Sequence, residues 1–203
     1  HGASVAMAGR VGSDSFGPTL TQNLQKNKVD TSHVITDPSA TGTAIIVVDS
    51  NGQNSIVLSS GANGQVTPED VDALSFQDVD MLLLQFEIPF ETVLHAASVA
   101  RQNGLRVILN PAPARPIPNN LLADIDILVP NESELSLLTG MPVTDATSAE
   151  PAAQALLGKG VQTVIVTLGS NGALLVTGEQ TTHVPAFQID AVDTTAAGDA
   201  FIG

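Results

Sequence analysis

Short apolar runs of strand length alternate along this chain with longer stretches of helical period. Residues 81–84 (MLLL) and 163–167 (TVIVT) are typical of buried strands, and residues 89–103, closed by Gly104, are typical of a helix. This order predicts an α/β fold with an open, mostly parallel sheet and helices on both faces. Sheets of this kind bind ligands beyond the carboxyl ends of their strands, so we expect functional residues there.

The same periodicity predicts further elements. Strands are expected at residues 4–8, 105–109, 125–129 and 173–176, with one or two short extended pieces within 182–189. Helices are expected from a cap at Asp14 to about residue 26, from Thr67 and Pro68 onward, from a cap at Asn131 to residue 138, and over residues 148–157. Polar residues or glycine follow several strands, namely Glu87, Asn110, Asn131 and Gly169. Their shared position at strand ends points to one site.

One β-rich segment interrupts the α/β order. Residues 43–49 and 55–59 flank the sequence Ser50-Asn51-Gly52, and Asn-Gly is a strong hairpin signal. We expect a hairpin over about residues 42–60, inserted as a flap into a single domain that spans residues 1–203.

Composition excludes several classes of function. Hydrophobic residues make up 43% of the 203 residues, yet no apolar run approaches membrane-spanning length, so we expect a globular protein without a membrane partner. The net charge of −14 repels a nucleic acid, and no Trp or Tyr is present to stack on its bases. The chain has no Cys, which fits a reducing cytoplasm, and its four His lack metal-ligand spacing.

The run of residues 193–199 (DTTAAGD) has the character of a loop that leads into a helix. The small residues Ala196, Ala197 and Gly198 let a phosphoryl group approach the free N–H groups of a helix start. Asp199 could accept a proton from an attacking hydroxyl. From the residues alone, an Asp-capped helix packed through small side chains explains the run slightly better.

Four ordered motifs resemble those of the ribokinase-like (PfkB) carbohydrate kinases. They are residues 9–17 (GRVGSDSFG), residues 130–134 (PNESE, an Asn-x-x-Glu motif), residues 167–172 (TLGSNG) and residues 193–199. The resemblance covers essentially the whole chain. Residues 84–87 (LQFE) and 109–114 (LNPAPA) resemble the members that phosphorylate ribose, whereas the Asp-Pro-Asn-x-Arg sequence of fructokinase-like members is absent.

The resemblance implies ATP-dependent phosphorylation of D-ribose at its terminal hydroxyl, with Asp199 as the base and Ala196, Ala197 and Gly198 as an anion hole. Glu87, with Asp199, would bind the sugar. Glu134 would hold Mg²⁺ through water, and Asp193 and Thr195 would contribute to a K⁺ site. The residues implied in nucleotide binding are Asn131, Thr167, Leu168, Gly169, Ser170, Asn171, Gly172 and Gly198.

Structural alternatives stay open for two motifs. Asn131 and Glu134 also fit a helix capping box, and residues 167–172 also fit a tight turn between strands. At the level of function, the alternatives are a kinase of another sugar or of a nucleoside, and a non-catalytic sugar- or nucleotide-binding relative. No GxxxxGK[ST] sequence is present, which disfavours a P-loop kinase.

The family's Gly-rich sugar-binding element has no counterpart in this sequence, and the last motif breaks off at Gly203. We therefore expect an internal piece of a kinase, with little or no kinase activity of its own and poor solubility. The resemblance further implies that the hairpin is part of a lid over the sugar. In the ribose kinases this lid joins two subunits, so we expect the parent protein to be a homodimer.

Overall fold

The computed structural model describes residues 2–48, 54–189 and 196–203 of the chain. The chain divides into two compact units. Unit 1 comprises His1–Ser75 and Glu87–Thr92, and unit 2 comprises Phe76–Phe86 and Val93–Gly203. Within the described residues, none of the helices combines the length and the apolar character that crossing a bilayer requires.

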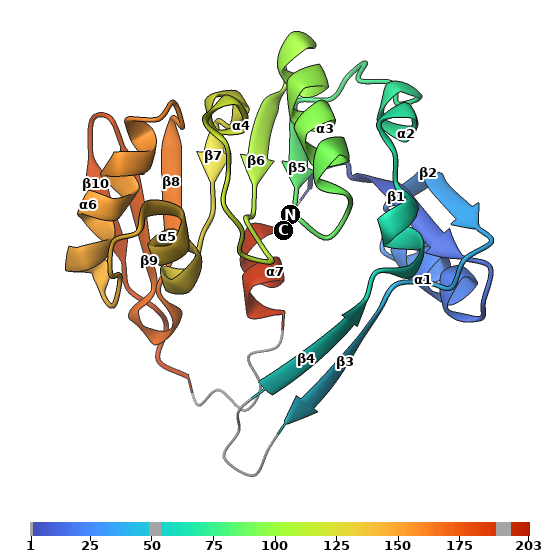
Figure 1. Ribbon diagram of the computed structural model, residues 1–203, viewed down its shortest axis with the longest axis horizontal. Coiled ribbons are helices and arrows are strands. Elements are labelled where there is room, and N and C mark those ends of the chain that lie inside the picture. Colours follow the sequence, from blue (N-terminus) through green and yellow to red (C-terminus); the bar gives the residue numbers. More distant parts are fainter. Residues whose placement is uncertain (1, 49–53, 190–195) are drawn as a thin grey trace. The chain divides into compact units, whose positions relative to one another are not determined.

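Unit 2 is built on a six-stranded sheet with the order β10-β9-β8-β7-β6-β5 (Figure 1). The strands β5 to β8 run parallel to one another, and β9 and β10 continue the sheet in antiparallel fashion. Their bounds are β5 Met81–Leu84, β6 Arg106–Leu109, β7 Ile127–Leu128, β8 Thr163–Thr167, β9 Ala173–Thr177 and β10 Thr181–Val184.

The helices of unit 2 follow these strands along the chain, and those that pack on the sheet do so with small and branched aliphatic side chains. They are α3 Phe90–Gln102 (its first turn belongs to unit 1), α4 Asn119–Asp124, α5 Glu132–Thr139, α6 Ala146–Leu157, the 3-10 turn η2 Gly169–Asn171, and α7 Ala197–Ile202. Helix α6 packs on β8 and β9. Its residues Ala149, Ala152 and Leu156 are fully buried or nearly so, as are Leu109 and Leu128 in the sheet. Each large aliphatic side chain buried in this way contributes about 1.5–3 kcal/mol.

Unit 1 contains two separate two-stranded sheets. Strands β1 Ala6–Gly12 and β2 Asp30–Asp37 pair in parallel and are connected by helix α1 Phe16–Lys26. Strands β3 Thr43–Val48 and β4 Asn54–Ser59 form an antiparallel hairpin that hydrogen-bonds to no other named strand of the described chain. The 3-10 turn η1 Gly61–Gln65 and helix α2 Pro68–Asp72 follow.

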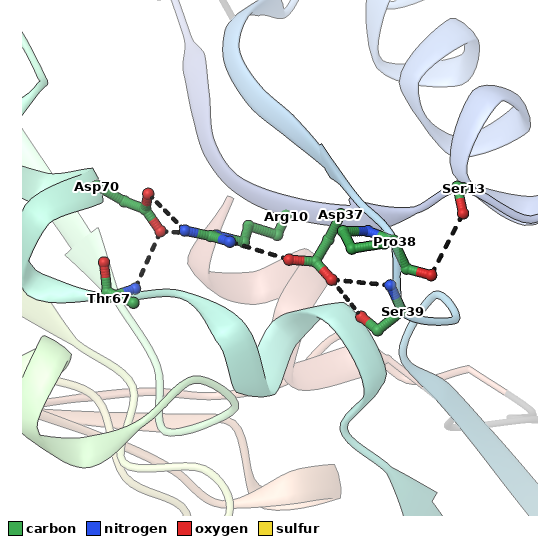
Figure 2. A network of polar contacts seen from close by, with 7 residues as sticks. All are labelled: Arg10, Ser13, Asp37, Pro38, Ser39, Thr67 and Asp70. Atoms are coloured by element: carbon green, nitrogen blue, oxygen red, sulfur yellow. Dashed lines mark hydrogen bonds and ion pairs between the residues drawn. The ribbon is translucent and has the colours of Figure 1, made fainter.

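An arginine joins β1, β2 and α2 of unit 1 (Figure 2). The guanidinium of Arg10 donates through Nε and Nη2 to the two oxygens of Asp70, at 2.8 and 2.9 Å, and through Nη1 to Asp37 at 2.9 Å. The hydrogen bonds from Arg10 lower the pKa of Asp70 below its usual range, and the pKa of Asp37 is lowered mainly by hydrogen bonds from Ser39. Both carboxylates are therefore ionised, and Arg10 offsets the cost of holding them in a part-buried place.

The carboxylate of Asp14 joins the start of α1 to the base of the hairpin. It accepts hydrogen bonds from the N–H groups of Phe16 and Gly17, at 3.0 and 3.2 Å, so it acts as the expected helix cap. It also accepts from the N–H and the hydroxyl of Thr41, at 2.8 and 2.6 Å. The buried Thr41 hydroxyl in turn accepts the N–H of Gly12 at 3.0 Å. A side chain at Gly12 would collide with the backbone of Ala40 and Thr41, so this close approach requires glycine.

Most of the expected elements are confirmed, including the parallel sheet, the hairpin and the helices that begin after Thr67 and Asn131. The first strand was placed wrongly at residues 4–8 and lies over Ala6–Gly12, whose glycines and Arg10 fall outside the apolar run that marks the other strands. Strand β2 and helix α4 were not expected. Strand β2 mixes Asp, Thr, Ser and His with its apolar residues, so it lacks the apolar run that marks the other strands. The expectation of one domain over residues 1–203 stays a prediction.

Candidate functional site

The carboxyl ends of the parallel strands in unit 2 form one continuous hydrogen-bonded edge. The N–H of Asn110, after β6, donates to the carbonyl of Leu84 in β5 at 2.9 Å, and its buried side-chain amide donates to Val129 after β7 at 3.1 Å. Beyond β7, the carbonyl of Pro130 accepts the N–H of Thr167 at the end of β8, at 2.9 Å. These bonds hold the loops after β5, β6, β7 and β8 at fixed spacing. The strand-end position of Asn110, Asn131 and Gly169 is thereby confirmed.

Asn131 and Glu134 form a capping box at the start of α5. The side-chain oxygen of Asn131 accepts the N–H of Glu134 at 2.8 Å, and the Glu134 carboxylate accepts the N–H of Asn131 at 2.8 Å. The interpretation of Asn131 and Glu134 as a capping box is therefore confirmed. A capping box does not exclude a further role of these side chains in binding a ligand. Glu134 is only 7% exposed, and its burial raises the pKa of its carboxyl above the ordinary value, against the smaller lowering by the Asn131 N–H.

Residues 167–172 form a tight turn between β8 and β9. The N–H of Leu168 donates to the carbonyl of Gly172 at 2.8 Å, and the N–H of Asn171 donates to the carbonyl of Leu168 at 2.9 Å. Gly172 has a φ of 90°, and a side chain there would collide with the carbonyl of Val184. Ser170 and Asn171 are exposed, whereas Leu168 is buried. The turn thus presents backbone and short polar side chains at the same edge of the sheet.

Asp199 lies in the first turn of α7 and is exposed. Its Oδ1 accepts a hydrogen bond from Nε2 of Gln85, the residue that follows β5, at 3.3 Å. The preceding Ala196 adopts the left-handed conformation with a φ of 58°, and the helix begins with Ala197 and Gly198. The carboxylate that the sequence motif singled out therefore lies at the carboxyl end of the parallel strands.

The predicted site residues are divided between the two units. Asn131, Glu134, Asp199 and the turn 167–172 belong to unit 2, whereas Glu87 is an exposed residue of unit 1. Asp193 and Thr195, predicted for K⁺, lie outside the described residues.

The donor set can be tested against a metal ion. The described residues contain no group of three or more His, Cys, Asp or Glu side chains that could hold one. Near the capping box, Glu134 offers one carboxylate, and one of its oxygens accepts the Asn131 N–H. One carboxylate is too few to hold a metal ion by protein ligands alone. A single carboxylate fits Mg²⁺, which keeps several waters and takes one or two carboxylates together with substrate phosphates.

Two residues at this edge were absent from the predicted site. Gln85 hydrogen-bonds to Asp199, and Nε2 of His183 in β10 lies 2.7 Å from the carbonyl oxygen of Asn171 in the turn. The position of Gln85 directly after the apolar run of β5 is the signal that could have identified it, as a strand-end position identified Asn110. His183 lies in an exposed strand, and nothing in its sequence surroundings marks it.

Comparison with known proteins adds an independent line of evidence. The sequence model described as "pfkB family carbohydrate kinase" matches residues 1–203. A deoxyribokinase from Salmonella typhimurium is 42% identical over 205 residues, which cover 99% of this chain and 67% of the relative. A ribokinase from Staphylococcus aureus is 41% identical, with coverage of 96% and 65%. The chain thus spans about two thirds of the length of these relatives.

Solved structures show the same fold. The ribokinase from Arabidopsis thaliana in complex with ribose and ATP matches with a TM-score of 0.87 and 34% identity, over 98% of this chain and 67% of that chain. The crystal structure of Sa239 matches with a TM-score of 0.88 and 39% identity, over 97% and 66%. The likeness covers both units and the carboxyl edge of the sheet.

Proposed function

Because the chain belongs to the pfkB family of carbohydrate kinases, which transfer a phosphoryl group to a sugar hydroxyl, we propose that the protein carrying it uses ATP to phosphorylate D-ribose at its terminal hydroxyl. The observation that carries this proposal is the carboxyl edge of β5 to β8. At this edge, unit 2 holds the Asp199 carboxylate in the first turn of α7, the tight turn of residues 167–172, and the capping box of Asn131 and Glu134 at the start of α5. Relatives named ribokinase support ribose as the sugar.

In this proposal each group has a defined task. Asp199 accepts the proton of the sugar's terminal hydroxyl. The N–H groups of Ala196, Ala197 and Gly198 face the charge that develops on the transferred phosphoryl group. Glu87 hydrogen-bonds to the ribose hydroxyls. The residues proposed to line the nucleotide are Asn131, Thr167, Leu168, Gly169, Ser170, Asn171, Gly172 and Gly198.

Cations complete the proposed site. Mg²⁺, when bound with ATP, supplies positive charge that neutralises the phosphates, and Glu134 holds it through water. Asp193 and Thr195 contribute oxygen ligands to a K⁺ ion that activates the enzyme.

A second candidate substrate is 2-deoxyribose. A specific observation favours it, because two deoxyribokinases at 42% identity stand beside the ribokinases. The two sugars differ by one hydroxyl. A site built to hydrogen-bond that hydroxyl rejects the sugar that lacks it, whereas a site that leaves it unbound accepts both.

The test compares sugars and one variant. The protein is assayed for ADP release with ribose, 2-deoxyribose, fructose and adenosine. We expect kcat/KM to be highest for ribose, and a higher value for 2-deoxyribose would replace the first proposal with the second. Asp199→Asn removes the proposed base and should lower kcat by about 10²- to 10⁴-fold. Asp124→Asn, at the end of α4 and away from the site, is the matched control and should leave kcat unchanged. Unchanged turnover in Asp199→Asn would remove the base assignment.

A further inference from the structure

The contact between Gln85 and Asp199 joins residues that are 114 positions apart in the chain. Nε2 of Gln85 donates to one carboxylate oxygen of Asp199 at 3.3 Å. We propose that Gln85 is a positioning residue, which orients the Asp199 carboxylate toward the sugar hydroxyl. This inference rests on the proposed role of Asp199 as the base.

The backbone on both sides of Gln85 is fixed. The carbonyl of Leu84 accepts the N–H of Asn110 at 2.9 Å, and the N–H of Phe86 donates to the carbonyl of Ala112 at 2.8 Å. Leu84 and Phe86 are both buried, at 7% and 5% exposure. The side chain of Gln85 therefore starts from a rigid point of the sheet edge, from which its amide reaches Asp199.

The carboxylate of Asp199, in contrast, is not held in place by packing. Asp199 is exposed on α7, a helix of six residues, and its carboxylate is free to rotate unless another group holds it. Strand β5 and helix α7 carry no other titratable side chain. The nearest charged residues on the paired strands, Asp80 and Arg106, lie at the opposite ends of β5 and β6. The uncharged amide of Gln85 thus donates its hydrogen bond to Asp199 where β5 and β6 place no charged side chain beside it.

The chemistry follows from the geometry of a carboxylate. An N–H bond to Oδ1 fixes the plane of the group and leaves Oδ2 with its lone pairs for the substrate proton. A base must be within hydrogen-bond reach of the proton that it removes, and hydrogen bonds that are long without substrate tighten in the productive complex. The distance of 3.3 Å is consistent with such a bond. Loss of the donor should slow proton transfer and leave sugar binding nearly intact.

Two variants separate orientation from packing. Gln85→Met keeps the length of the side chain without a donor, and Gln85→Glu keeps its shape and replaces the donor with a carboxylate that repels Asp199. We expect kcat to fall about tenfold in Gln85→Met and further in Gln85→Glu, with KM for the sugar changed less than about twofold. If Gln85 only packed, Gln85→Met, which keeps the length of the side chain, would retain most of the activity of the parent.

A matched control is available in the same unit. Nε2 of Gln162 donates to Asp126 at 2.9 Å, at the amino-terminal edge of the sheet, so Gln162→Met loses the same kind of bond away from the site. It should leave kcat unchanged. If kcat in both Gln85 variants stays within about twofold of the parent while Asp199→Asn is inactive, Gln85 does not position the base. If Asp199→Asn is active, the base assignment itself is wrong and the inference falls with it.

A readout without catalysis checks the contact directly. In a ¹⁵N-labelled sample of the chain, the side-chain NH₂ resonances of Gln85 are assigned by their loss in Gln85→Met. Asp199→Asn should shift these resonances, whereas Asp124→Asn should not. Resonances that do not respond to Asp199→Asn would overturn the contact, and with it the proposal, whatever the level of activity.

Discussion

At the scale of single residues, Glu134 shows how one side chain can have two tasks. Its carboxylate closes the capping box with the N–H of Asn131, and it is the acid proposed to hold hydrated Mg²⁺. Substitution can separate the two tasks, because Gln also serves in a capping box but carries no charge. Glu134→Gln should therefore keep α5 intact and weaken only the binding of Mg²⁺ with ATP.

The pH dependence of stability tests the burial of Glu134. Burial raises the pKa of this carboxyl above its ordinary value of 4.5, so the folded chain holds the proton more tightly than the unfolded chain. The stability that comes from the protonated form is present at low pH and is lost as the pH rises through the raised pKa. A glutamine at position 134 does not titrate, so Glu134→Gln does not lose stability in this way as the pH rises. The free energy of unfolding of Glu134→Gln, relative to the parent, should increase from pH 4 to pH 7 in urea denaturation, and a constant difference would contradict the raised pKa.

At the scale of elements, the base of the hairpin depends on a small set of buried polar bonds. The hydroxyl of Thr41 donates to Asp14 and accepts the N–H of Gly12, and Thr41 is only 5% exposed. The carboxylate of Asp14 also caps α1. These bonds tie the start of α1, the end of β1 and the entry to β3 together.

Thr41→Val tests this set of bonds. Valine keeps the shape of threonine but leaves the buried N–H of Gly12 without its acceptor, which should cost about 1–3 kcal/mol of unfolding free energy. Urea denaturation measures the change. Thr36→Val, at an exposed position of β2, is the matched control and should have little effect. Equal midpoints for the two variants would show that the hydroxyl of Thr41 does not hold the base of the hairpin.

At the scale of the whole molecule, the hairpin exposes apolar side chains on both of its faces. Ile45 and Val57 pair across the strands on one face, and Leu58 lies on the other, and each is about 60% exposed. We propose that one face covers the sugar and the other joins a second copy of the protein. Because this chain contributes a net charge of −14 to each copy, repulsion opposes the association and salt should strengthen it.

Sedimentation equilibrium at low and high NaCl tests the dimer. The fraction of dimer should rise with salt. If the face of Ile45 and Val57 forms the interface, Val57→Asp should abolish the dimer; if the opposite face forms it, Leu58→Asp should do so. The other substitution should instead raise KM for the sugar. A monomer under all conditions, in the parent protein, would contradict the proposal.

The sequence predicted the elements whose signal is local. Strands β5 and β8, the caps at Asp14 and Asn131, and the paired strands β3 and β4 all depend on signals from neighbouring residues, and the structure contains them. The Asn-Gly turn itself lies outside the described residues, and β5 is less buried than expected, since Met81 and Leu83 are exposed. Strand β2 was missed because parallel pairing with β1 stabilises it in spite of its polar residues. The contact between Gln85 and Asp199 could not be predicted, because it depends on the order of the strands and on where α7 begins. The roles of the site residues came from the family resemblance, and they remain predictions.

The hairpin has one more consequence. Its backbone hydrogen bonds close within β3 and β4, and its anchor lies in the few residues around Thr41 and Gly61. Such a module can be exchanged between related proteins without disturbing a core strand, provided that the residues at its base are kept. Evolution could therefore change the contacts of the hairpin independently of the sheet of unit 2.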